Sequence, residues 1–223
     1  MKGIIKIISC SVILFICSIN KCKSQFNQPP YNPKVGVLAG VQISNIVTSA
    51  GMSLTPLSSY HFGALVEIPL FDYYSLAPQV IYSLQGFKQL ANGQPNAVDT
   101  TTEIAFLNFP VEFKFYVYKG LAIEPTVYIG FIVNTQKTFL DLNHDPMPEN
   151  KTIISSDYIG NGTLKKFDYG LGLGLSYNFK FGLICKLKYY FGGQNLLPDK
   201  EGLPAGKTEM VQFSIGYLFK NKK

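Results

Sequence analysis

Arginine and tryptophan are absent from this sequence of 223 residues, histidine occurs only twice, and charged residues make up only 15% of it. Arginine is the residue best suited to paired hydrogen bonds with phosphate, so its absence argues against a nucleic-acid-binding protein. The net charge of +6 does not reverse this, because four of the twenty lysines lie in the first 24 residues, which contain no acid. The other 16 lysines face 14 acidic residues, and a charge near +2 is no nucleic-acid signature.

Cysteine is also scarce, with four residues in the chain. Three of them, Cys10, Cys17 and Cys22, lie in the same first 24 residues, so removal of that segment leaves only Cys185 and no internal disulfide. Acylation of Cys17 or Cys22 as in a lipoprotein is an alternative. It is disfavoured because Ile16 and Lys21 stand where such sites have a small residue.

The first 24 residues have the parts of a secretory signal peptide. Lys2 and Lys6 form a basic start, residues 7–19 form an apolar core, and small residues precede a cleavage site after Ser24. The core is shorter than the ~20 residues of a membrane-spanning helix, which disfavours a retained anchor. We therefore expect a signal peptide at 1–24.

Helical patterning is missing too, since no window shows convincing apolar spacing at i, i+3, i+4 and i+7. The segment FDYGLGLGLSYNF at 167–179 has glycines that suggest a dinucleotide-binding loop, G-x-G-x-x-G. Counted from Gly170 or Gly172, however, the sixth position is Leu175 or Tyr177, so both registers fail. Apolar and small or polar residues instead alternate throughout the segment, which predicts a β-strand.

Eight segments of the chain alternate in this way. Each is longer than the ~5–6 residues usual in globular proteins and reaches the ~9–11 residues that cross a bilayer at a tilt. They are Val35–Val47, Tyr60–Phe71, Tyr74–Lys88, Thr101–Tyr118, Leu121–Gln136, Lys165–Phe179, Phe181–Gly192 and Lys207–Phe219.

The connections between these segments alternate between short and long. Three are very short: Asp72-Tyr73, Lys119-Gly120 and Lys180. The others are long: 48–59, 89–100, 137–164 and 193–206. Tight periplasmic turns and long extracellular loops are typical of outer-membrane barrels, and an even number of strands places both termini in the periplasm. We therefore predict an all-β, eight-stranded antiparallel up-and-down transmembrane β-barrel. The barrel domain would span 35–220, after a periplasmic N-terminal segment at 25–34.

One face of each predicted strand is apolar and the other is polar or small. In a membrane barrel the apolar face points outward, whereas in a soluble lipocalin-like barrel it points inward. The signal peptide, the strand length, the low charge content and the aromatic residues at strand ends favour the membrane. The aromatic residues expected in the interfacial girdles are Tyr73, Tyr74, Tyr116, Tyr118, Tyr177 and Phe179.

The polar face would then line the lumen. An eight-stranded barrel is only just wide enough for side chains, so the glycines of 167–179 are interpreted as spacers that leave room for longer groups opposite. Buried charges must be paired, which predicts a lumenal ion network. Its expected members are Glu67, Glu112, Lys114, Glu124, Lys186 and Lys188.

Several stretches, spread over the chain, carry a resemblance to a known family. They are SLAPQVIYSLQGFK (75–88), AFLNFPVEFKFY (105–116), FDYGLGLGLSYNF (167–179), LKYYFGGQNL (187–196) and FSIGYLF (213–219), together with the Ser24-Gln25 junction. With these stretches the sequence resembles the PorT-type outer-membrane β-barrel family of Bacteroidetes. The sequence departs from the family's usual Arg-Tyr at Lys188-Tyr189. The resemblance implies an outer-membrane location and an eight-stranded barrel. It implies no activity, and a link to protein secretion applies only to some members.

Candidate catalytic and metal-binding residues are few. His61 lies beside Ser58 and Ser59 at the expected outer rim, and His144 lies in the longest loop, but no G-x-S-x-G motif accompanies them. Residues 141–145 begin like a calcium loop, D-x-N-x-D. The pattern then fails, with proline where glycine is needed and threonine where the bidentate glutamate should be. We expect no enzyme activity, cofactor or metal. The sequons at 150–152 and 161–163 carry little weight in a bacterial protein.

Two functions from different classes remain. One is a non-enzymatic barrel with a structural, interaction or assembly role and specificity in the loops around 137–164 and 193–206. The other is a small-solute channel or ligand-binding barrel. The expected partners are outer-membrane lipid and unidentified proteins.

Overall fold

The computed structural model describes residues 32–48, 54–89, 100–140, 146–153, 165–197 and 206–219. The predicted signal peptide lies outside these residues, as does most of the segment 25–34. In the described part, the secondary structure consists of strands: β1 (Lys34–Thr48), β2 (Leu54–Phe71), β3 (Tyr74–Gln89), β4 (Thr100–Tyr118), β5 (Leu121–Leu140), β6 (Pro146–Ile153), β7 (Phe167–Asn178), β8 (Leu183–Leu197) and β9 (Gly206–Leu218). No helix in this part is long and apolar enough to cross a membrane.

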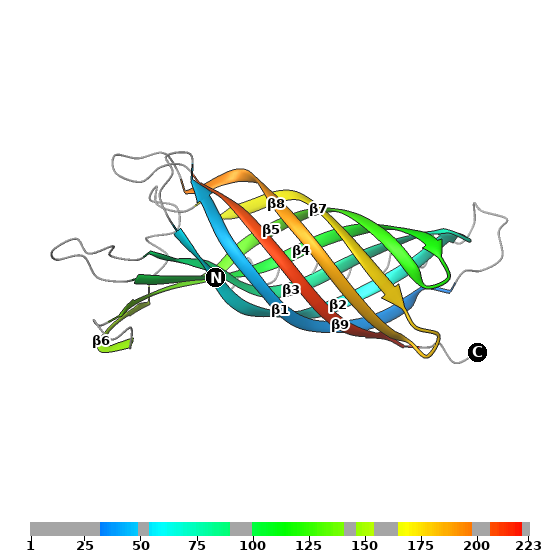
Figure 1. The fold of residues 1–223 in the computed structure, drawn as a ribbon, viewed down its shortest axis with the longest axis horizontal. Coiled ribbons are helices and arrows are strands. Elements are labelled where there is room, and N and C mark those ends of the chain that lie inside the picture. The colour runs from blue at the N-terminus through cyan, green and yellow to red at the C-terminus, as the bar shows by residue number, and fades with distance from the viewer. Residues whose placement is uncertain are drawn as a thin grey trace, which may run out of the picture. The chain divides into compact units, whose positions relative to one another are not determined.

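Among the described residues, every strand except β6 has a paired neighbour on both sides, and these strands close into a ring of eight. Sequential neighbours pair from β1 to β5, β5 then pairs with β7, and the circuit continues through β8 and β9 back to β1. All pairings are antiparallel. Figure 1 shows these strands winding at a tilt around a common axis. The predicted eight-stranded up-and-down barrel is confirmed.

The eight predicted strands are all present, but several extend further than predicted. β2 begins at Leu54, six residues before the predicted start at Tyr60, and β8 continues to Leu197. The additional strand β6 pairs with β5, its one partner among the described strands, in the region where a loop over 137–164 was predicted. Its sequence, PMPENKTI, has no apolar alternation that would have indicated a strand.

Short turns join the strands at one end of the barrel, which we call the turn end; the opposite end is the loop end. Asp72–Tyr73 connects β2 to β3, and Lys119–Gly120 connects β4 to β5. The third turn spans Phe179–Gly182, longer than the single residue predicted. Lys119 and Gly182 have positive φ angles of 46° and 109°, and the second is a conformation that favours glycine.

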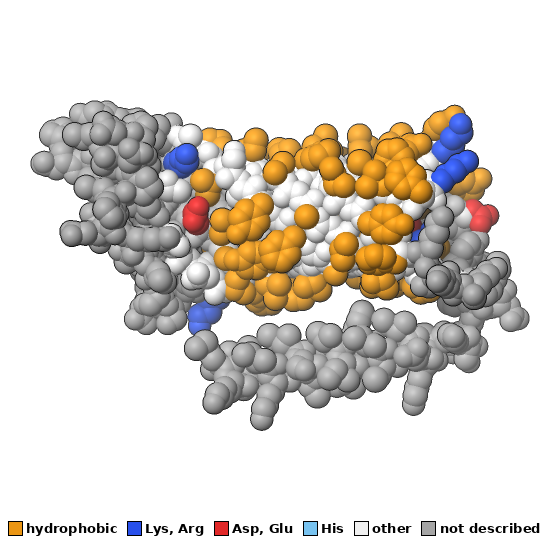
Figure 2. Space-filling view, turned by 90° about the horizontal axis from the view of Figure 1, so that it is seen from below, with side chains coloured by type: hydrophobic (Ala, Val, Ile, Leu, Met, Phe, Trp, Pro, Cys, Tyr) orange, Lys and Arg blue, Asp and Glu red, His pale blue; other side chains and the backbone are white. Residues whose placement is uncertain are grey.

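The outer surface of the barrel is apolar. On β7, Leu171, Leu173 and Leu175 are 63%, 57% and 51% exposed, whereas Gly172 and Gly174 between them are buried. Figure 2 shows apolar side chains over the middle of the visible face and charged side chains toward its two ends. This is the distribution of a barrel that meets hydrocarbon around its middle and water at its ends.

One irregularity changes which residues face inward. In the β4–β5 pairing, Ala105 lies opposite Asn134 and Phe106 lies opposite Ile132, so β5 contains one extra residue, Val133. Val133 and Asn134 are both exposed, and the following Thr135 is buried. A bulge of this kind shifts the alternation by one residue, so the two halves of β5 present opposite parities to the lumen.

Candidate functional site

Six charged side chains meet in the lumen toward the turn end. They come from β2, β4, β5 and β8, and each is at most 3% exposed: Glu67, Glu112, Lys114, Glu124, Lys186 and Lys188. Three carboxylates therefore face three ammonium groups with no net charge. These are the six residues that the face assignment placed together, because each occupies an inward position of its strand.

Lys114 joins the β2 and β5 members of this ion network. Its Nζ lies 2.8 Å from Glu67 Oε2 and 3.4 Å from Glu124 Oε1. Both partners are buried, so the attraction acts with little screening by water. Lys114 therefore ties two strands that are not neighbours in the sheet.

The two lysines of β8 complete the network. Lys186 Nζ lies 2.6 Å from Glu112 Oε2 and 3.5 Å from Glu124 Oε2. Lys188 Nζ contacts Glu112 and lies 3.1 Å from Glu124 Oε2. Glu124 is thus within 3.5 Å of all three lysines, which makes it the common centre of the network.

Glu67 is held by two further side chains at the turn end. Tyr116 donates its hydroxyl proton to Glu67 Oε1 at 2.7 Å, and Asn178 Nδ2 donates to Glu67 Oε2 at 3.2 Å. Asn178 also donates to the Tyr116 hydroxyl at 2.8 Å. The prediction that Tyr116 belongs to the interfacial girdle is therefore wrong. It shares the inward parity of Lys114, and its hydroxyl bonds inside the barrel.

The glycines of β7 lie opposite large lumenal side chains. A Cβ on Gly172 would be 2.8 Å from Cδ1 of Tyr190, and a Cβ on Gly174 would overlap Cγ of Lys188. In both cases the added Cβ would lie closer to the neighbouring carbon than real Cβ atoms do, so a larger residue would require a shift. These contacts agree with the interpretation of the glycines as spacers and show which side chains occupy the space: the ring of Tyr190 and the stem of Lys188.

A second polar group lies nearer the loop end. The carboxylate of Asp168 accepts hydrogen bonds from the hydroxyl of Tyr128 at 3.0 Å and from Oγ1 of Thr208 at 2.5 Å. Its other oxygen accepts from the backbone N–H of Tyr169 at 2.9 Å. Tyr128 packs edge-on against Tyr190, with ring centroids 5.5 Å apart. Asp168 is therefore satisfied by hydrogen bonds rather than by a cation.

His61 does not lie at the rim, as the sequence analysis expected. It is only 1% exposed, inside the lumen, and its Nε2 lies 2.7 Å from Oγ of Ser214. The expectation was wrong because β2 begins at Leu54, which places His61 well within the strand. In the described structure its Nδ1 has no hydrogen-bond partner, so no third group orients the ring as in a catalytic triad.

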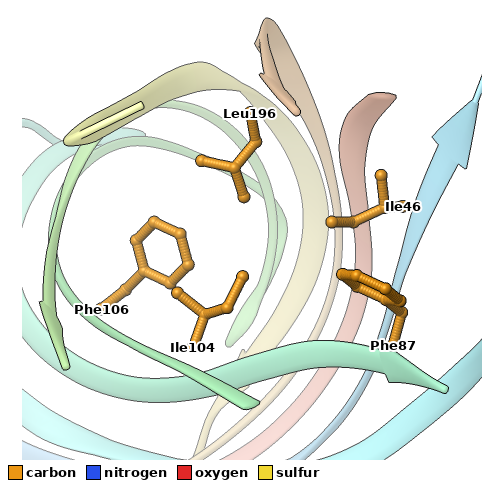
Figure 3. Close-up of a cluster of buried hydrophobic side chains, with 5 residues drawn as sticks. All are labelled: Ile46, Phe87, Ile104, Phe106 and Leu196. Atoms are coloured by element: carbon orange, nitrogen blue, oxygen red, sulfur yellow. The ribbon is translucent and has the colours of Figure 1, made fainter. Parts of the chain in front are cut away.

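Apolar side chains fill the lumen toward the loop end. We call this cluster the apolar plug; Figure 3 shows its members converging from β1, β3, β4 and β8. Each is at most 9% exposed: Ile46, Phe87, Ile104, Phe106 and Leu196. Sequence reasoning missed the plug, although apolar residues on both faces of β4, as in Ile104-Ala105-Phe106, were a signal that this part of the lumen is not polar.

Two spaces bordered by described lumenal residues are very small. The space bordered by Asn108, Tyr128, Tyr190 and Gln212 measures about 10 Å³, and the one beside the plug measures about 0 Å³. A single water molecule needs ~10–15 Å³ of such volume. Neither space could therefore hold a solute.

In the described residues, no group of three or more His, Cys, Asp or Glu side chains is arranged to hold a metal ion. The predicted weak calcium loop at 141–145, with His144, lies outside the described residues, as does the sequon at 161–163. The sequon at 150–152 lies in β6. Cys185 is a free cysteine.

The family model described as "Outer membrane protein beta-barrel domain" matches residues 24–196. The chain belongs to this family. The apolar exterior of the barrel therefore faces the lipid of an outer membrane, and the soluble lipocalin-like alternative is set aside. Curated protein sequences give no match.

Solved structures with a similar fold come from other outer-membrane proteins. Ail, the attachment invasion locus protein of Yersinia pestis, solved with the heparin analogue sucrose octasulfate, is 10% identical with a TM-score of 0.48, over 84% of this chain and 99% of Ail. Neisserial surface protein A is 10% identical with a TM-score of 0.47, over 84% and 99% of the two chains. OprG from Pseudomonas aeruginosa is 12% identical with a TM-score of 0.38, over 85% and 97%.

Proposed function

We propose that this protein is a closed, non-enzymatic outer-membrane barrel that holds its loops at the cell surface for a structural, interaction or assembly role. The observation that carries the proposal is the filled lumen. A neutral ion network occupies it toward the turn end, and the apolar plug occupies it toward the loop end. To pass through, a hydrated solute would have to separate the ion pairs of the network and bring water into the apolar plug.

The chemistry of the lumen supports a role without catalysis. His61 and Ser214 are close enough to exchange a proton, but they are only 1% and 4% exposed. Among the described residues, the buried aspartate of the lumen is Asp168, and it bonds to Tyr128 and Thr208 and not to His61. A substrate could therefore reach this pair only after the barrel interior had rearranged.

The orientation and processing of the chain are part of the proposal. Both termini of the barrel domain lie at the turn end, where β1 begins and β9 ends, and we place this end in the periplasm. Residues 1–24 would be removed as a signal peptide, so that the mature protein begins at Gln25. Mass spectrometry of the protein purified from outer membranes would test this, and retention of Met1 would contradict it.

We further place the chain in the PorT-type branch found in Bacteroidetes, with a role in assembly or secretion. The support is the resemblance in 75–88, 105–116, 167–179 and 187–196, which form parts of β3, β4, β7 and β8. Proteins that co-purify in mild detergent would identify the partner. Their loss from a variant that lacks residues 198–205 would show that this loop carries the specificity.

Electrical recording in planar lipid bilayers tests the closed lumen. The purified barrel should give no steady current steps above the lipid baseline, because neither lumenal space reaches the size of a solute. A Phe87→Ala/Phe106→Ala variant, which removes two rings of the plug, is the matched comparison. Steady ohmic steps from the wild-type protein would favour the small-solute channel instead.

A further inference from the structure

Three exposed lysines gather at the loop end over β7, β8 and β9. Lys165 and Lys166 directly precede β7, and Lys207 is the second residue of β9. The backbone N–H of Lys165 bonds to the carbonyl of Leu196 on β8, and Lys207 pairs with Asn195 on the same strand. The lysines therefore lie on either side of β8, about 10 Å apart at an interstrand spacing of ~4.8 Å. We call them the outer lysine patch.

Positive charge is not cancelled within this patch. In the part of the chain that the structure describes, none of the three lysines forms an ion pair. Glu209, two residues from Lys207 along β9, accepts a hydrogen bond from the hydroxyl of Tyr189 at 2.7 Å. Asp168, two residues from Lys166, is buried and bonded to Tyr128 and Thr208, so the exposed part of the patch carries three lysines with one partly exposed acid below them.

The opposite side of the barrel is different. There Lys88, on β3, has Glu103 of β4 diagonally across the strand pair, because Glu103 pairs with Gly86 two residues away. Opposite charges at such diagonal positions are within reach of long side chains. No ion pair joins Lys88 and Glu103 in the described residues, but one lysine there has one acid nearby, whereas the three lysines of the patch have one partly exposed acid, Glu209.

Aromatic side chains place the patch at the membrane surface. Directly below it, Phe167, Tyr169 and Phe191 point outward and are 42%, 47% and 51% exposed. The rings of Phe167 and Tyr169 stack with centroids 6.3 Å apart, and those of Tyr189 and Phe191 lie 4.3 Å apart. Aromatic residues gather where hydrocarbon meets headgroups, and lysines near that level extend toward the headgroups.

We propose that the outer lysine patch binds the phosphate groups of a phosphorylated glycolipid headgroup in the outer leaflet. The ammonium groups supply the charge that two phosphates on a sugar headgroup require, and the aromatic surface below continues into the region of the acyl chains. This continuity selects a lipid rather than a soluble anion, since a soluble anion would gain nothing from the apolar surface. The proposal rests on the loop end facing outward, as in the proposed function.

Lipid retention in detergent tests the proposal. The probe is bisphosphorylated lipid A, with dephosphorylated lipid A for comparison, bound to the purified full-length barrel and quantified by native mass spectrometry. The Lys165→Gln/Lys166→Gln/Lys207→Gln variant should bind bisphosphorylated lipid A roughly a hundredfold more weakly, since each of the three lysines at a charged lipid surface contributes about a fivefold factor. Heat-modified gel migration checks that the variant remains folded.

A matched variant changes three exposed lysines at the turn end, Lys34→Gln/Lys119→Gln/Lys180→Gln, and should bind as the wild type does. Equal binding by the patch variant, or equal binding of dephosphorylated lipid A, would overturn the proposal. Displacement of lipid A by inorganic phosphate at comparable affinity would assign the patch to a soluble anion and overturn the lipid assignment. Conductance of the same samples reports separately on the closed lumen, so the two proposals can fail independently.

Discussion

The ion network and the apolar plug fill the lumen in different ways. Toward the turn end, buried lysines and glutamates contact one another within 3.5 Å beside an apolar cluster of Leu38, Leu65, Ile81, Ile184 and Leu218. Toward the loop end, the five apolar side chains of the plug pack together. Both arrangements exclude solutes, but only the first depends on the identity of each partner. A buried charge that loses its partner keeps its desolvation cost, while an apolar side chain that is shortened loses contacts in proportion to its size.

The ion network and the plug also differ in how strongly they fix the pairing register of the strands. A slip of one residue in β8 would move Lys186 and Lys188 to the lipid face and bring Leu187 inside. A similar slip at the plug would exchange some apolar residues for others, as at Ile104-Ala105-Phe106. We infer that the ion network specifies the strand register and that the plug mainly adds packing.

The largest expected effect is in the ion network. Lys186→Met removes the ammonium group 2.6 Å from Glu112 and 3.5 Å from Glu124. We expect a loss of about 4 kcal/mol in the free energy of unfolding, the cost of breaking a buried pair. Urea unfolding in lipid vesicles measures it.

A second substitution identifies the partner. Adding Glu112→Gln to Lys186→Met should recover part of the loss, because Glu112 then keeps only its contact with Lys188 and its removal leaves two carboxylates facing two lysines. Glu67→Gln should recover less, since Glu67 is paired with Lys114. Equal recovery by both would show that the network is not arranged as described.

The plug should respond less and without any such rescue. Phe106 is 1% exposed, and Phe106→Ala should cost about 3 kcal/mol, at the lower end for a buried phenylalanine. Because the plug and the ion network lie toward opposite ends, its effect should add to that of Lys186→Met in the same unfolding experiment. Strong non-additivity would mean that the two ends are coupled.

On the outward face, a charged side chain should cost more stability within the hydrocarbon of the membrane than near the membrane surface. Leu187 lies between two lumenal lysines and is 52% exposed, so Leu187→Lys should cost about 2 kcal/mol on the lipid face. Phe181→Lys, in the turn between β7 and β8, should cost no more than about 1 kcal/mol. If Leu187→Lys had no effect, Leu187 would not face lipid.

The smallest expected loss in the free energy of unfolding is at the spacer glycines of β7. Gly172→Ala places a methyl group 2.8 Å from the ring of Tyr190 and should cost about 1 kcal/mol. Tyr190→Leu in the same chain should reduce this penalty, because the ring that the methyl group meets is gone. An equal penalty with leucine at 190 would assign the cost to the strand backbone instead.

The sequence predicted the strands and their faces well because a period of two is a local property. Once Glu112, Glu124 and Lys186 were assigned to one face, barrel closure brought them together. The ends of the strands were less predictable, since they depend on pairing with neighbours. For this reason the predicted start of β2 lay too far along the sequence, and His61 was wrongly predicted to lie at the rim.

Other features could not be predicted because they interrupt the two-residue alternation of apolar and polar side chains, or because their sequences do not alternate at all. The bulge at Val133 reverses the faces of β5 without any change in composition. β6 forms by pairing with the outer part of β5 although its own sequence does not alternate. Tyr116 is aromatic and lies near a strand end, so only its parity distinguishes it from a girdle residue.

The central claim is that the lumen is filled and dry while the outer face meets lipid. Methyl-group NMR of the unmodified barrel in nanodiscs tests it, with a water-soluble gadolinium chelate and a lipid-attached nitroxide as relaxation agents. We predict that Leu171, Leu173 and Leu175 are broadened by the nitroxide only, and that Ile46, Ile104 and Leu196 are broadened by neither agent. Broadening of the plug methyls by the gadolinium chelate would contradict a closed lumen, and broadening of the β7 leucines by it would contradict the lipid-facing surface.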